Sequence, residues 1–198
     1  MTAPQLADPG RYAESWPLLH AHSLTIRALQ PEHADLEVRF GLALSLQSRY
    51  ERFLGGGVKL TPELLARLVN VDLSRDAALI ATVTFAGSET PIGVGRYARA
   101  AEEPVAEIAV TVADAWQGCG LGRLLLERVI DAARRNAVRR LTGDVLAANA
   151  RMLALARRSG FRVEPHPEGG TLRRIVKDLD DEPTAFVGMP APFPPTEA

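Results

Sequence analysis

The sequence predicts an α/β (α+β) protein with a mixed, mostly antiparallel sheet and helices on both faces. The first observation is the order of elements that the 198 residues suggest: a strand, two helices, three strands, a helix, a strand, a helix and two strands. The second is that short turns join the three central strands, and such turns connect antiparallel neighbours. The third is a long helix with one apolar face, which a sheet must cover. A meander followed by crossovers favours this architecture.

The first part of the chain predicts an arm, a strand and a helix. Residues 1–22 contain three prolines and are predicted to form an irregular N-terminal arm. Leu24–Ala28 alternates as a strand does. Pro31 suits the first turn of a helix. The apolar residues of that helix would share one face; they are Leu36, Phe40 and Leu44.

A connection and a second helix are predicted before the central strands. Ser45–Tyr50 is interpreted as the connection, and Gly55–Gly57 as a flexible break. Thr61 is a suitable N-cap for the second helix. Leu64, Leu65 and Leu68 of this helix are predicted to face inward.

Three strands followed by the longest helix are predicted in the middle of the chain. The strands are Ala77–Phe85, Ile92–Ala98 and Val105–Val112, and the helix is Gly120–Asn136. Its apolar residues recur every three or four positions. They are Leu121, Leu124, Leu125, Val129 and Ala132.

The remaining elements complete a single domain over residues 23–179. Leu141–Leu146 is predicted to be a strand, and Asn149–Ser159 a helix that ends at Gly160 in a left-handed cap. Phe161–Val163 and Leu172–Lys177 are predicted to pair as a hairpin. Residues 180–198 are acidic and then proline-rich, which is typical of a tail.

The composition argues against several classes of function. Basic and acidic residues nearly cancel, 23 against 24, so no charge excess indicates a nucleic acid or a membrane as partner. With only Cys119, no internal disulfide can form, and neither a signal segment nor a long apolar run is visible. A cytoplasmic protein is expected. The four histidines lack ligand spacing, so no metal site is expected.

The segment Gln117–Gly122 carries the clearest chemical signal. Its alternate glycines lie between a predicted strand and the longest helix, where the backbone can approach a ligand closely and the helix N-terminus favours phosphate. A tight turn without ligand is the alternative, although glycines at alternate positions would then cost stability without structural return. The spacing differs from the dinucleotide fingerprint, and the G-K-[ST] of a P-loop is absent.

Two motifs make the chain resemble the GNAT superfamily of N-acetyltransferases. Gln117–Arg123 resembles the pyrophosphate loop of that family, and Asn149–Phe161 resembles its second motif. The resemblance runs from about Leu24 to Lys177. It implies acetyl-CoA as co-substrate and a sheet whose fourth and fifth strands splay to admit the pantetheine arm. It also implies a set of cofactor-binding residues: Val110, Thr111, Val112, Gln117, Gly118, Cys119, Gly120, Leu121, Gly122, Arg123 and Asn149.

Four further stretches resemble the catalytic domain of bacterial protein-lysine acetyltransferases that regulate acyl-CoA synthetases. They are Leu44–Phe53, Val71–Asp72, Ala106–Ala109 and Val145–Asn149. This resemblance implies a protein lysine as the acceptor amine. Two alternatives stay open, namely a small-molecule amine as acceptor and a catalytically silent domain that senses acyl-CoA.

Glu107 is the candidate general base. It is the only charge in Val105–Val112, and we expect it to be buried, which would favour basicity near neutral pH. The resemblance likewise implies a glutamate on this strand as proton acceptor. The alternative is a residue at the end of a strand that pairs with an arginine. Cys119 is weighed as a covalent nucleophile, but direct transfer is preferred. Arg49 and Arg52 are candidates for the acceptor site, with surface arginines as the alternative.

Overall fold

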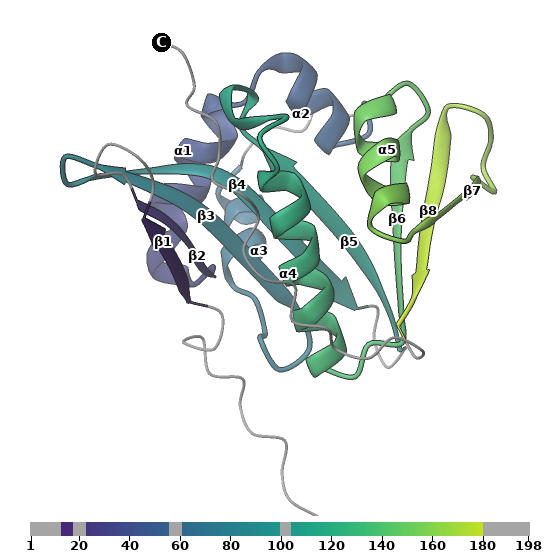
Figure 1. Cartoon of the computed structure of the whole chain (residues 1–198), viewed down its shortest axis with the longest axis horizontal. Helices are drawn as coiled ribbons and strands as arrows, with labels where there is room; N and C mark the ends of the chain where they lie inside the picture. The colour runs from purple at the N-terminus through teal and green to yellow at the C-terminus, as the bar shows by residue number, and fades with distance from the viewer. Residues whose placement is uncertain (1–12, 18–22, 56–60, 100–103, 180–198) are drawn as a thin grey trace, which may run out of the picture.

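The computed structural model describes residues 13–17, 23–55, 61–99 and 104–179. Within them, eight strands form one sheet in the order β1-β2-β3-β4-β5-β6-β8-β7 (Figure 1). The strands are β1 (Glu14–Pro17), β2 (Ser23–Ala28), β3 (Ala77–Phe85), β4 (Ser88–Arg99), β5 (Val105–Val112), β6 (Arg140–Leu146), β7 (Arg162–Pro165) and β8 (Leu172–Asp178). The helices are η3 (Pro31–His33), α1 (Ala34–Ala43), α2 (Leu46–Arg52), α3 (Pro62–Val69), η4 (Asp114–Trp116), α4 (Leu121–Arg135) and α5 (Ala150–Arg158).

The pairing of the strands confirms the predicted mixed, mostly antiparallel sheet. Neighbours from β1 to β5 are antiparallel, β5 and β6 are parallel, and β6, β8 and β7 are again antiparallel. The parallel pair is the one that α4 connects, since a parallel connection needs a long crossover.

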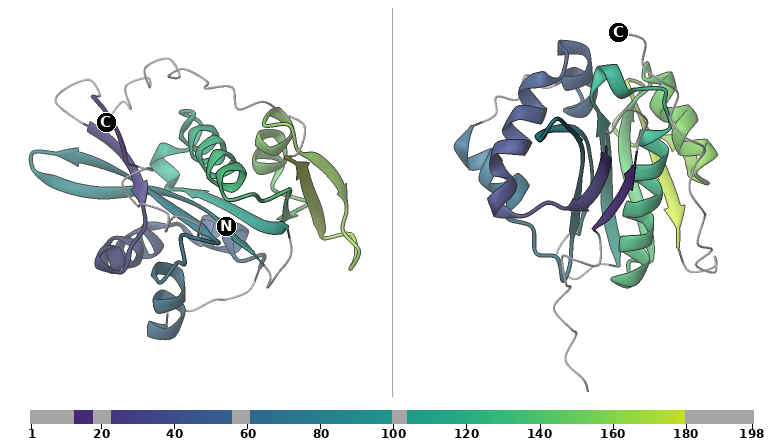
Figure 2. Two further views of the ribbon diagram at one scale, coloured as in Figure 1. Left: turned by 90° about the horizontal axis from the view of Figure 1, so that it is seen from below. Right: turned by 60° about the vertical axis from the view of Figure 1, so that its left-hand side comes forward.

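Helices cover both faces of the sheet, as predicted. Figure 2 shows α4 and α5 on one face and α1 and α3 on the other. Alternate residues of β3 enter opposite cores: Leu79 and Ala81 join the core beneath α4, whereas Ala78 and Ile80 join Phe40 of α1. Among the helices that the structure describes, none has the length and apolar character needed to cross a bilayer.

Two predicted segments differ from the structure. Ser45–Tyr50, interpreted as a connection, belongs largely to α2, whose N-cap Ser45 accepts a hydrogen bond from the Ser48 amide (3.1 Å). This helix is short, and its Leu46 is 80% exposed, so the sequence has no amphipathic pattern that would predict the helix. Within the predicted irregular arm, Glu14–Pro17 pairs with β2 as an edge strand, a position that tolerates proline. The predicted tail at 180–198 lies outside the described residues.

The strands β5 and β6 separate along their length. Their register pairs end at Glu107 opposite Thr142. Figure 1 shows the two strands close together at one end and apart at the other. Gly143 follows directly on β6. A Cβ at Gly143 would lie 2.9 Å from the Ile108 carbonyl oxygen, so a glycine is needed where the strands begin to part.

Replacing Gly143 with alanine should therefore destabilise the fold. Because the added carbon meets backbone rather than a movable side-chain end, we expect a loss of about 1–3 kcal/mol in the free energy of unfolding. Urea unfolding of the variant measures this. Gly170→Ala is the matched control, since nothing lies within 4 Å of a Cβ there. Equal stability of the two variants would contradict the close approach at Gly143.

Candidate active site

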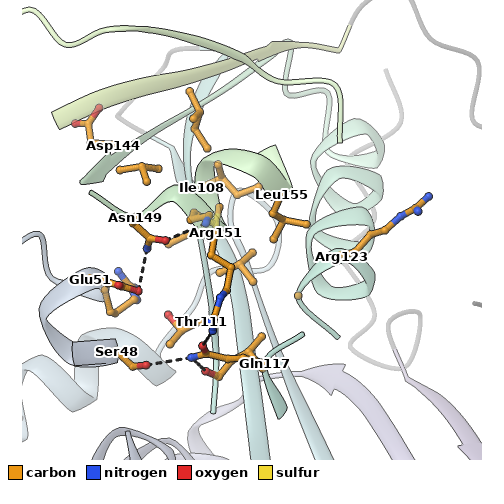
Figure 3. A pocket seen from close by; sticks show the side chains of 18 of the residues that line it. Ser48, Glu51, Ile108, Thr111, Gln117, Arg123, Asp144, Asn149, Arg151 and Leu155 are labelled. Atoms are coloured by element: carbon orange, nitrogen blue, oxygen red, sulfur yellow. Dashed lines mark hydrogen bonds between the residues drawn. The ribbon is translucent and has the colours of Figure 1, made fainter. Parts of the chain in front are cut away.

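A pocket opens where β5 and β6 diverge. Its volume is about 400 Å³, within the range of roughly 300–1,000 Å³ usual for small-molecule sites. The walls come from α2, β5, the glycine loop, the first turn of α4, β6 and α5 (Figure 3). Segments far apart in the sequence thus meet at one cavity, and most of the predicted site residues line it.

The free edge of β5 forms one wall. The Ala113 amide donates to Ile92 of β4, so the polar groups of Val110 and Val112, at alternate positions, point toward the cavity. The Val112 carbonyl accepts a hydrogen bond from Gln117 Nε2 (3.1 Å). Thr111 Oγ1 is buried without a partner among the described residues. Together these groups offer hydrogen bonds to an extended, amide-bearing ligand such as a pantetheine arm.

The glycine loop leads into the N-terminus of α4. Gly118 and Gly120 have φ angles of 83° and 98°, a region that favours glycine, and a Cβ at Gly118 would meet nothing within 4 Å. The amides of the first turn of a helix lack partners within it, so they can bind a pyrophosphate. The open loop and the start of α4 can therefore accommodate a phosphate group.

The residues between these glycines point elsewhere. Gly118, Gly120 and Gly122 line the pocket, whereas Leu121 is buried in the core and Cys119 Sγ donates to the Trp116 carbonyl (2.9 Å). Neither side chain is among those that line the cavity. For these two predicted cofactor-binding residues, only the backbone can take part.

Cys119→Ser should accordingly keep near-normal turnover, because a hydroxyl can donate to the same carbonyl. Alkylation of the native thiol should still inhibit, since the added bulk would distort a loop whose neighbouring glycines line the pocket. Steady-state CoA release measures both effects. A large loss of activity in Cys119→Ser, or an acetylated cysteine trapped by mass spectrometry, would instead support a covalent route.

Gln117 connects the loop to two helices. Its Nε2 donates to Ser48 Oγ of α2 (3.1 Å), and its Oε1 accepts from Arg151 of α5 (Figure 3). Ser48 Oγ also donates to Asp114 (2.9 Å). Hydrogen bonds from Ser45, with a smaller contribution from Ser48, lower the pKa of Asp114. The Gln117 side chain thus links the loop to α2 and α5, and its predicted contact with the cofactor stays a prediction.

Asn149 is the N-cap of α5 and also lines the pocket. Its Oδ1 accepts from the Met152 amide (2.9 Å), while its Nδ2 donates to Glu51 Oε2 of α2 (3.0 Å) (Figure 3). A ligand that contacts the Asn149 amide must therefore share it with Glu51 or displace the carboxylate.

Positive charge gathers along the outer part of the pocket. Arg123, Arg151 and Arg158 line it and are exposed. Arg123 pairs with Glu127 (2.7 Å), but an exposed pair of this kind is worth only ~0–1 kcal/mol and can yield to a phosphate. These side chains complement an anionic ligand lying over the start of α4.

Glu107 lies at the junction of β5 and β6, and its side chain is exposed. The prediction that it is buried is wrong. Ala106 and Ile108 turn into the core beneath α4, so Glu107 between them faces the other side of the sheet, where it lines the pocket. The apolar composition of the strand did not reveal which face each residue takes.

Among the residues described, three carboxylates line the pocket, and two of them accept hydrogen bonds from other side chains. Glu51 accepts from Gln47 (2.7 Å) and Asn149, and Asp144 accepts from Arg174 (2.9 and 3.2 Å). Burial alone would raise the pKa of Asp144, but hydrogen bonds from Arg174 and His166 outweigh it and lower the pKa. Among the residues that the structure describes, none donates a hydrogen bond to the side chain of Glu107.

The two candidate acceptor-site arginines differ in position. Arg52 lines the pocket, whereas Arg49 is not among the lining residues. Burial lowers the pKa of Arg52 to about 10, with a smaller contribution from Arg96, so the guanidinium remains charged near neutral pH.

Sequence reasoning missed several residues of the pocket. Ser48 and Glu51 lie on α2, which was interpreted as a connection. Arg151 and Arg158 are seven residues apart on α5, and this spacing places them on one helix face, a signal that could have found them. Ala156 is fully buried, and no tyrosine lines the pocket in the described part of the chain.

Comparisons with known proteins agree on the family. The family model described as "Acetyltransferase (GNAT) family" matches residues 50–161. "Acetyltransferase PA5475" of Pseudomonas aeruginosa is 38% identical over 146 residues, which are 74% of this chain and 78% of that protein. The GNAT domain of S. lividans PAT superposes with a TM-score of 0.75 at 26% identity, covering 87% of this chain and all of that domain.

A further solved structure contains the co-substrate. It is yncA, described as a putative acetyltransferase from Salmonella typhimurium with its cofactor acetyl-CoA, with a TM-score of 0.60, 25% identity and coverage of 80% and 95% of the two chains. The glycine loop, the separation of β5 and β6 and the family match all support the same family. The chain belongs to the GNAT family of acetyltransferases and is an enzyme that uses acetyl-CoA as its acetyl donor.

Proposed function

We propose that the enzyme acetylates the side-chain amine of a protein lysine by direct attack, with Glu107 as general base. The observation that carries this proposal is that Glu107 lines the pocket at the β5–β6 junction and accepts no hydrogen bond from the described side chains. The likeness to the GNAT domain of S. lividans PAT, together with the resemblance in Leu44–Phe53 and Val145–Asn149, favours a protein as acceptor. Cys119 is the only cysteine, so the chain can form no internal disulfide of the kind common in secreted proteins. We therefore propose that the enzyme acts in the cytoplasm.

Separate parts of the pocket bind the pyrophosphate and the pantetheine arm of acetyl-CoA. Bound acetyl-CoA supplies an activated thioester. Amides of Gly118–Gly122 hold the pyrophosphate, and the edge of β5 at Val110 and Val112 holds and orients the arm. Fixing the acyl group in this way converts the reaction with the amine into an effectively unimolecular step.

Glu107 removes the proton that blocks attack. A lysine amine has a pKa of about 10.4 and is almost fully protonated at neutral pH. Glu107 accepts that proton directly or through one water, and the neutral nitrogen then attacks the thioester carbonyl. The nitrogen gives up its second proton to solvent as the amide forms, and the thiolate that leaves takes a proton from solvent. Among the described residues, no tyrosine lines the pocket to supply that proton.

A product screen tests the proposal. The enzyme is incubated with acetyl-CoA and either lysate proteins or a set of small amines, and acetylated products are identified by mass spectrometry. Acetyl-lysine in proteins, accompanied by stoichiometric CoA release, is the expected result. Acetylation of small amines alone would overturn the protein acceptor, and no CoA release with any amine would favour a domain that only senses acyl-CoA.

A further inference from the structure

Arg52 is a largely covered cation that faces the pocket. It is the last residue of α2, lines the cavity, and stacks over the ring of Phe53 at 5.3 Å from the ring centroid. Burial is the main reason why its pKa falls to about 10, while Glu37 and Glu107 raise the pKa. Within the described residues, no oxygen accepts a hydrogen bond from its guanidinium.

Two arginines near Arg52 and Glu107, neither of which lines the pocket, are engaged. Arg96 donates to Glu37 Oε1 (2.8 Å) and to the Leu68 carbonyl (3.2 Å), and Arg174 forms a two-bond pair with Asp144. A guanidinium has five N–H donors, and covering them without acceptors is costly. Arg52 therefore has free donors at the place where a substrate would bind.

Arg52 and Glu107 lie close enough to influence one another but do not form an ion pair. Glu107 is among the charges that raise the pKa of Arg52, yet no contact within 4 Å joins the two side chains among the described residues. The pocket thus presents a separate anion on β5 and a separate cation on α2. This arrangement is complementary to a molecule with an ammonium group and a carboxylate.

We propose that the acceptor of this enzyme carries a carboxylate near its amine, and that Arg52 binds that carboxylate while Glu107 faces the ammonium. The inference rests on the proposed amine acetylation and adds the class of acceptor. The planar guanidinium can bind a carboxylate through two parallel hydrogen bonds. An acidic residue beside a peptide lysine and the free α-carboxylate of a lysine are two sources of the same chemistry.

Paired acceptors test this inference. One pair consists of blocked, amidated peptides in which a single lysine is flanked by glutamate or by glutamine. The other pair is Nα-acetyl-lysine with a free carboxylate and its amide. CoA release should give a kcat/KM about 10- to 100-fold higher for the carboxylate-bearing member of at least one pair, and the pair that responds identifies the source.

Substitution of Arg52 should remove this preference. Arg52→Gln should lower kcat/KM for the carboxylate-bearing acceptor to that of its neutral partner, and Arg52→Lys, which keeps the charge, should retain part of the preference. Arg67→Gln, an exposed arginine on α3 outside the pocket, is the matched control. Acetyl-CoA affinity by calorimetry should be the same in all variants.

The outcomes separate this inference from the proposed function. Equal use of charged and neutral acceptors by the wild type, or an equal loss on both with Arg52→Gln, overturns the role of Arg52 while amine acetylation stands. Absence of turnover with every amine overturns both. If Arg52→Gln does not fold, the preference of the wild-type enzyme within each pair of acceptors still tests whether the acceptor needs a carboxylate.

Discussion

Replacing Gly120 with glutamate should abolish acetyl-CoA binding while the domain stays folded. Gly120 is the N-cap of α4 with a φ of 98°, and it lines the pocket. A side chain there would occupy the space of the pyrophosphate, and its negative charge would repel it. Losing two hydrogen bonds to a charged group costs about 3–6 kcal/mol, so calorimetry should record at least about a 100-fold weaker affinity.

A second glycine controls for backbone strain. Gly87 has a φ of 79° in the turn between β3 and β4, away from the pocket, and a Cβ there would meet nothing within 4 Å. Gly87→Glu introduces the same charge and a similar strain, and should bind acetyl-CoA as the wild type does. Unchanged affinity in a folded Gly120→Glu variant would mean that the glycine loop does not hold the co-substrate.

Local patterns were sufficient to predict most of the fold. Val105–Val112 was predicted with the bounds that β5 has, and the apolar spacing of Leu121, Leu125 and Val129 predicted α4. Thr61 and Gly160 were recognised as cap residues, because their chemistry acts within one turn of the chain. These elements depend on nearest neighbours in sequence, which is why the sequence alone reveals them.

The unpredicted features depend on tertiary contacts. The N-terminus of α2 is held by Asp114, which accepts from the Ser45 amide (3.0 Å) and from Ser45 Oγ (2.7 Å) across 69 positions of sequence. No local sequence pattern predicts a contact between residues so far apart. Because α2 was not predicted, Glu51 and Ser48 were not recognised as residues of the pocket. The exposure of Glu107 likewise depends on which face of β5 meets α4, and that is decided by packing.

Glu107→Gln should slow turnover strongly without weakening acetyl-CoA binding. The substitution keeps the shape of the side chain and removes its basicity, and loss of a general base typically costs about 10²–10⁴-fold in rate. Glu63→Gln, at an exposed glutamate of α3 outside the pocket, is the matched control and should turn over normally. A loss of acetyl-CoA affinity in Glu107→Gln would identify Glu107 as a structural residue of the co-substrate site.

The pH dependence of kcat in the wild type and in Glu107→Gln tests the central claim most directly. A lysine amine loses its own proton as pH rises toward its pKa of about 10.4, so a missing base matters less at high pH. We therefore expect the variant to recover part of its rate between neutral and alkaline pH, so that the gap to the wild type narrows. A gap that stays constant with pH, or wild-type turnover of Glu107→Gln at every pH, would contradict the assignment of Glu107 as the base.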